Sequence, residues 1–172
     1  EADIVALVAR AIKEYGAIDL FVSNAGIAVG GGVEVPDDDI RRLIAEIEVP
    51  LNLEMAATEE MLAIALQLRP RACCLVPEKR AERTTEGGLD VAGQRDALAP
   101  MIRAMRDGGI RVSLFVEPAK RQLEAARSIG APVVELHTGA YCEAEGAARR
   151  DQLRRLQEAA AQAEALGLEC HA

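Results

Sequence analysis

Two patterns of hydrophobic and polar residues follow one another along most of the chain. Short, nearly continuous apolar runs are separated by stretches in which apolar residues recur every three or four positions. The short runs predict buried strands, and the helical spacing predicts amphipathic helices. The predicted strands cover residues 19–23, 50–56, 72–78, 111–117 and 132–139, and a further strand begins at 168–172.

The stretches between these strands predict helices. Ile4, Val8 and Ile12 mark one face of the first, which ends near Gly16. A second starts at Pro36, where three aspartates suit the positive end of the helix dipole. Further helices are predicted over residues 58–68, 94–108, 120–130 and 149–167. Strict alternation of strand and helix predicts an α/β fold with a parallel sheet of about six strands.

Chain length limits how this sheet closes. The chain has 172 residues, whereas an eight-unit (β/α) barrel typically needs about 250. We therefore expect a single α/β domain over 1–172 that forms an incomplete (β/α) barrel, with an open doubly wound Rossmann-like sheet as the alternative. An incomplete barrel leaves sheet edges unpaired, and such edges favour a homodimer.

Composition narrows the classes of partner. Half of the residues are hydrophobic but only 2% are aromatic, so the core is aliphatic. The net charge of −8 argues against nucleic acid and against an anionic membrane surface as partners. No apolar run approaches the roughly 18 residues of a membrane span, and no signal-peptide pattern opens the chain. A cytoplasmic location is expected.

The four cysteines, Cys73, Cys74, Cys142 and Cys170, form no C-x-x-C pair. Cys73 and Cys74 are adjacent within the apolar run RACCLVP, where cysteines usually act as small buried hydrophobes. We expect structural thiols in a reducing compartment and no metal site, with metal or redox roles as the alternative.

The connection between residues 77 and 93 is unusually long and polar. Most loops in compact α/β domains are shorter, and long ones are often functional lids. Because residues 78–92 offer little to bury, we expect this loop to be mobile.

The N-terminal part, AIKEYGAIDLFVSNAGI, resembles the middle of a short-chain dehydrogenase/reductase, over about residues 4–35. Asn24, Ala25 and Gly26 stand in that family's N-A-G motif. The resemblance implies proximity to a dinucleotide, yet no G-x-G-x-x-G fingerprint follows a first strand, and no Tyr precedes a Lys by four residues. We therefore interpret Asn24 as a strand-end cap and expect no cofactor.

The remainder resembles the pyridoxine 5′-phosphate synthase (PdxJ) family over about residues 38–172. This resemblance rests on four segments: PLNLEMAATEEM, PEKRAERTTEGGLDVAGQ, GIRVSLFVEP and GAPVVELHTGAY. It implies a (β/α)₈ barrel that condenses 1-deoxy-D-xylulose 5-phosphate with 3-amino-2-oxopropyl phosphate without an organic cofactor. Together the two resemblances suggest a chimera, with a dehydrogenase-like piece at 1–37 joined to a barrel fragment at 38–172.

The resemblance implies roles for three residues, and the alternation of side chains along a strand adds a fourth candidate. Glu54 matches a catalytic glutamate that moves protons, and its apolar neighbours in the strand predict desolvation and a raised pKa. Glu135 matches an acidic residue that supports the transition state. Thr84 matches a ligand-contacting threonine, and His137 is a candidate substrate-binding residue on the same strand face as Glu135. The alternatives are a hydrogen-bonded glutamate within a barrel layer, a solvated loop for Thr84, and a structural hydrogen-bonding role for His137.

Departures from the family pattern bear on activity. The family's strand before NLEMA carries a catalytic histidine and, two residues later, an arginine, where this chain has Ser23 and Ala25. The first strand of the family and its second catalytic histidine have no counterpart in the 172 residues. We therefore expect a catalytically incompetent folded scaffold. An active, diverged pyridoxine 5′-phosphate synthase is the alternative, and a dehydrogenase fragment is a weaker one.

Overall fold

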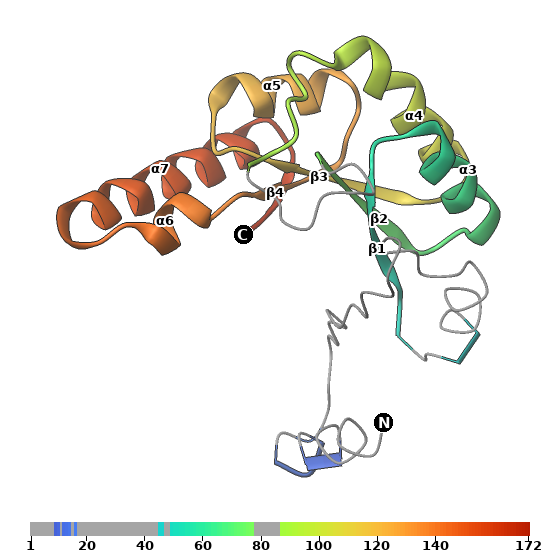
Figure 1. Ribbon diagram of the computed structural model, residues 1–172, viewed down its shortest axis with the longest axis horizontal. Coiled ribbons are helices and arrows are strands. Elements are labelled where there is room, and N and C mark those ends of the chain that lie inside the picture. The colour runs from blue at the N-terminus through green and yellow to red at the C-terminus, as the bar shows by residue number, and fades with distance from the viewer. Residues whose placement is uncertain (1–8, 11, 15, 17–44, 47–48, 78–86) are drawn as a thin grey trace, which may run out of the picture.

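The computed structural model describes residues 9–10, 12–14, 16, 45–46, 49–77 and 87–172. Within them, strands and helices alternate along the chain (Figure 1). The strands are β1 (Asn52–Ala56), β2 (Ala72–Val76), β3 (Arg111–Val116), β4 (Val133–Leu136) and β5 (Glu169–His171). The helices with described bounds are α3 (Glu59–Leu68), α4 (Arg95–Asp107), α5 (Lys120–Ser128), α6 (Gly139–Glu143) and α7 (Gly146–Ala165).

These elements confirm the predicted alternation from residue 50 onward. The short helix α6 is an addition, because residues 132–139 were predicted as one strand, whereas β4 ends at Leu136. The strand predicted at 19–23 lies outside the described residues, as do most of the two helices predicted on either side of it. The N-A-G motif at 24–26 lies outside them as well.

The five described strands form one parallel sheet in chain order, β1-β2-β3-β4-β5. A doubly wound sheet would contain a point where the strand order reverses, and the described strands show no such reversal. The alternative prediction is therefore wrong for this part of the chain. Because β1 and β5 stand at opposite ends of the order, the described sheet is open, as expected for an incomplete (β/α) barrel.

One face of the sheet is apolar and covered by helices. Alternate strand residues point to it, and they pack in a single core with the apolar sides of α3, α4, α5 and α7. Figure 1 shows α3, α4 and α5 on the same side of the strands. The strand residues of this core are Met55, Cys73, Leu75, Val112, Leu114, Val116, Val134 and Leu136. The polar residues of the strands consequently lie on the opposite face.

Local chemistry determines where the helices begin and end. Thr58 caps α3, its hydroxyl oxygen accepting a hydrogen bond from the Met61 amide at 3.2 Å, and Glu59 and Glu60 occupy the first turn. Arg69 ends the same helix in the left-handed conformation, with φ of 50°. None of the described helices has the length and apolar character needed to cross a membrane.

The C-terminal part of the long loop packs against the fold. Leu89 and Val91 are 2% and 0% exposed, and the Leu89 amide donates to the carbonyl oxygen of Phe115 at 2.7 Å. Gln122, which is also buried, accepts from the Ala92 amide at 2.9 Å and donates to Oδ1 of Asp90 at 2.7 Å. The expectation that residues 78–92 have little to bury is therefore wrong for Leu89 and Val91. Residues 78–86 lie outside the described residues.

Candidate active site

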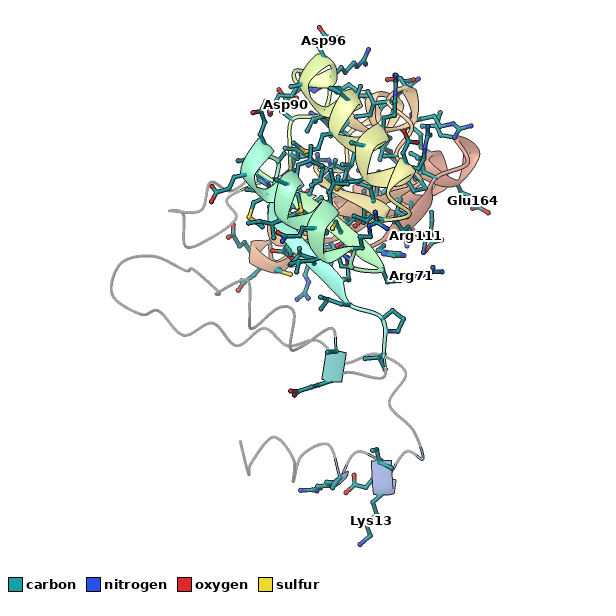
Figure 2. All side chains as sticks on the ribbon, turned by 90° about the vertical axis from the view of Figure 1, so that its right-hand side faces the viewer. Lys13, Arg71, Asp90, Asp96, Arg111 and Glu164 are labelled. Atoms are coloured by element: carbon teal, nitrogen blue, oxygen red, sulfur yellow. The ribbon has the colours of Figure 1, made fainter. Side chains whose placement is uncertain are left out.

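The polar face of the sheet is richest in functional groups toward its carboxyl edge. The five described strands are parallel, so their carboxyl ends meet at one edge, where α/β proteins usually bind ligands. Asp90, in the connection after β2, lies toward this edge, and Arg71 and Arg111 mark the opposite edge at the starts of β2 and β3 (Figure 2). Register places Glu54, Cys74 and Ser113 in one row across β1, β2 and β3.

Ser113 and Glu135 connect β3 to β4 on this face. The Ser113 hydroxyl donates to Oε1 of Glu135 at 2.6 Å, and its oxygen also lies 3.4 Å from the carbonyl oxygen of Cys73. Ser113 is only 6% exposed, whereas Glu135 is half-buried. A buried hydroxyl needs a partner, and this one orients a carboxylate at the end of a strand.

The Cys74 thiol lies among these groups and is buried. Burial raises its pKa to about 12; a hydrogen bond with Ser113 lowers it, and the negative charges of Glu135 and Glu54 raise it. Burial alone raises the pKa of Cys73 to about 12. Both side chains therefore stay protonated near neutral pH and serve as packing groups, as the sequence pattern indicated. Cys142 is exposed and Cys170 is half-buried.

Glu54 is exposed on the polar face of β1. Its neighbours Leu53 and Met55 point to the helix-covered face, because successive strand residues alternate sides. The predicted desolvation of Glu54 by these neighbours is therefore wrong in the described structure. The negative charge of Glu54 nevertheless raises the pKa of the Cys74 thiol, as does the charge of Glu135. Both predicted carboxylates therefore lie near Cys74.

A second polar group forms where β3 and β4 end. Nδ1 of His137 lies 2.7 Å from Oε1 of Glu117, and the same oxygen accepts a hydrogen bond from the Gly88 amide at 3.2 Å. The His137 amide donates to the carbonyl oxygen of Val116 at 2.9 Å, which extends the β3–β4 pairing. One carboxylate oxygen thus connects the loop, the end of β3 and the end of β4.

Close packing holds the His137 ring in place. Phe115 meets it edge to face, with ring centroids 5.3 Å apart. A Cβ added at Gly139 would lie 2.6 Å from Nε2 of His137, so any larger residue at the start of α6 would displace the ring. The side chain of His137 is 20% exposed. This imidazole is therefore fixed on two sides and still reachable by solvent.

Sequence reasoning found part of this arrangement. Glu135 and His137 were predicted to share a face, and both lie toward the carboxyl edge. Glu117 and Ser113 were missed, although Glu117 directly follows an apolar strand, a position that could have marked it as a candidate. Thr84 lies outside the described residues.

Two other features of the described residues lie apart from this site. No group of three or more His, Cys, Asp or Glu side chains among them is arranged to hold a metal ion. A cavity of about 360 Å³ opens at the opposite edge of the sheet, away from the carboxylates. It is lined by Arg71, Ile102, Arg106, Gly109, Ile110, Arg111, Val112 and Pro132.

Comparison with known proteins identifies the family. The family described as "Pyridoxal phosphate biosynthesis protein PdxJ" matches residues 33–172. The pyridoxine 5′-phosphate synthase of Rhodospirillum rubrum is 66% identical over 139 residues, which make up 80% of this chain and 56% of that protein. The enzyme of the same name from Gluconobacter oxydans is 59% identical over 138 residues, covering 80% of this chain and 57% of that protein.

Among solved structures, a xylose isomerase domain protein from Planctomyces limnophilus aligns with a TM-score of 0.47 and 16% identity, over 71% of this chain and 52% of that one. The chain thus spans little more than half the length of the curated relatives given above. On the match over residues 33–172, the chain belongs to the PdxJ family.

Proposed function

We propose that this chain carries the carboxylate part of a pyridoxine 5′-phosphate synthase site. In that reaction 1-deoxy-D-xylulose 5-phosphate condenses with 3-amino-2-oxopropyl phosphate. Glu54 would move protons during condensation and dehydration, and Glu135 would support the transition state. His137 would contact substrate, and Thr84 would contact it from the long loop.

One observation supports this proposal above the others. Glu54 and Glu135 lie on the polar face of the described parallel sheet, and Glu135 and His137 lie toward the carboxyl edge, where such folds bind ligands. The exposure of Glu54 suits a proton-transferring group, which must come within hydrogen-bond distance of a substrate atom. The hydrogen bond from Ser113 holds Glu135 in a defined orientation, as a transition-state-stabilising group requires.

We also propose that the chain as it stands does not complete the condensation. By the resemblance, Ser23 falls near the place of the family's histidine, and an unactivated hydroxyl neither accepts nor releases a proton near neutral pH. Histidine suits both directions of transfer. Ala25 in place of the arginine removes a cation that could hold a phosphate, and correct positioning can contribute roughly 7–11 kcal/mol to catalysis.

Product formation from both phosphorylated substrates tests these two proposals. The chain is compared with Glu54→Gln, which has the same shape without the charge. We expect no turnover above that variant. Binding should still be measurable by titration calorimetry with each substrate, and it should weaken in Glu54→Gln and in Glu135→Gln. Turnover well above the Glu54→Gln variant would refute incompetence, and the absence of any binding would refute the site assignment.

We further propose that residues 1–32, which precede the family match, have a different origin from the rest, so that the junction lies before the predicted boundary at residue 37. The family match begins at residue 33, and the N-A-G segment that precedes it resembles a dehydrogenase. Sequencing the source DNA in single uninterrupted reads across this junction tests the idea. We expect one reading frame through both segments. Reads in which a histidine-containing synthase strand precedes NLEMA would overturn it.

A further inference from the structure

Three backbone segments meet at one carboxylate oxygen, Oε1 of Glu117. The loop contributes the Gly88 amide at 3.2 Å, His137 directly after β4 contributes its Nδ1 at 2.7 Å, and Glu117 itself follows β3 directly. Glu117 is 41% exposed at its side chain, and His137 is 20% exposed. The contact therefore lies at the rim of the site and not inside the core.

The chemistry of this contact determines where the imidazole carries its proton. An ionised carboxylate can only accept hydrogen bonds, so Nδ1 of His137 must be the donor. In the neutral ring, Nε2 is then the nitrogen with the lone pair. Among the described residues, no hydrogen bond reaches this Nε2, which packs against Gly139. The ring thus presents a proton acceptor of fixed orientation.

The loop side of the contact is equally constrained. A Cβ added at Gly88 would lie 2.2 Å from the backbone nitrogen of Glu117 and 2.4 Å from the carbonyl carbon of Val116. The loop backbone therefore lies directly against the end of β3, where the Leu89 amide also donates to Phe115. The position of Gly88 and the orientation of His137 are tied to the same carboxylate.

We propose that Glu117 is a positioning residue of this site. It holds His137 in the Nδ1–H form, which leaves Nε2 as a proton acceptor, and it anchors the C-terminal end of the long loop through Gly88. The assignment of Nε2 to a ligand rests on the proposed function. The tautomer and the anchor do not depend on it, and both are measurable in the chain alone.

The chain contains two histidines, which makes the measurement direct. His171 is paired through the other nitrogen, since its Nε2 lies 2.8 Å from Oε1 of Glu169. Two-bond ¹H–¹⁵N correlation spectra above the titration range should therefore show His137 as the Nδ1–H form and His171 enriched in the Nε2–H form. Wild-type His137 in the Nε2–H form would overturn the proposal.

Two variants separate positioning from general stability. In Glu117→Ala, His137 should lose its preference for the Nδ1–H form, and exchange of the Gly88 amide should accelerate roughly tenfold or more, as expected when a charged acceptor is lost. In the matched control Glu169→Ala, the tautomer of His171 should change and the tautomer of His137 should not. Glu117→Gln, which retains an acceptor, should preserve part of the Nδ1–H population.

An unchanged His137 tautomer in folded Glu117→Ala would contradict the proposal. If Glu117→Ala fails to fold, the wild-type tautomer and the Glu117→Gln variant decide the question. None of these measurements depends on substrate turnover. A chain without product formation that shows the Nδ1–H form therefore supports the positioning role, whatever the outcome for the proposed function.

Discussion

The Ser113 hydroxyl donates to Oε1 of Glu135 at 2.6 Å, diagonally across two neighbouring strands. In the register of β3 and β4, Ser113 lies opposite Val133, and Glu135 lies opposite Phe115. The bond therefore links groups two positions apart on the same face of the sheet. It fixes one oxygen of a carboxylate at the carboxyl edge, where the position of negative charge decides what can bind.

Ser113→Ala should destabilise the fold by about 1.5–3 kcal/mol, since it removes a hydrogen bond to a charged acceptor. Ser128→Ala serves as a control at an exposed position, where the Ser128 hydroxyl donates to the neutral carbonyl oxygen of Ala125 at 2.7 Å. The control should cost only about 0.5–1.5 kcal/mol. Urea denaturation measures both free energies of unfolding. Equal losses in the two variants would argue against an ionised Glu135 as the acceptor.

Substitution by alanine should have different effects on stability at two neighbouring glycines. At Gly88 a Cβ would lie 2.2 Å from a backbone nitrogen that cannot move without displacing β3, whereas at Gly87 the nearest atom is Oε1 of Glu117 at 3.8 Å. Gly88→Ala should cost about 1–3 kcal/mol through overpacking, and Gly87→Ala should have little effect. Urea denaturation and exchange of the Leu89 amide report the difference. Comparable stability of the two variants would show that the loop does not lie against β3.

The cysteines should label in order of exposure. Cys142 is exposed and should react first with iodoacetamide, and Cys170 should follow more slowly because burial raises its pKa. Cys73 and Cys74 should remain unlabelled at pH 8, since burial raises the pKa of each to about 12. Peptide mass spectrometry after timed labelling gives the order, and unfolded protein serves as the control. Rapid labelling of Cys74 in the native chain would contradict its buried position.

Asp90 should make stability depend on pH in the acidic range. Hydrogen bonds from the Gln122 side chain and the Gly93 amide hold the pKa of its carboxyl below the ordinary value of 3.8. A lowered pKa in the folded state means that the ionised form is the stabilised one. This contribution is present above pH 3.8 and is lost as the pH falls through the folded value.

The carboxyl ¹³C shift of Asp90 in an acid titration measures this pKa directly. The Asp90→Asn variant should show a flatter dependence of the unfolding free energy on pH between 3.8 and the folded pKa, because it has no charge to lose. Titration of Asp90 at or above its ordinary pKa would refute the role of Gln122.

Local pattern was sufficient for the main elements of the fold. The run RVSLFVE predicted a strand over residues 111–117, and β3 covers Arg111–Val116. The spacing in KRQLEAARSIG predicted a helix over 120–130, and α5 covers Lys120–Ser128. These features depend on the period of side chains along a single segment, which is encoded within that segment. The same period placed Glu135 and His137 on one face.

Contacts between segments decided the rest. Nothing in the local pattern connects Glu117 with Gly88 or His137, which lie 29 and 20 residues away along the chain. The exposure of Glu54 and the burial of Leu89 likewise depend on which face the helices cover and on where the loop returns. The sequence by itself determined the period and order of the elements, because both arise from neighbouring residues. Only the tertiary structure decided which groups contact the same carboxylate oxygen of Glu117, because register and packing bring together residues that are far apart in the chain.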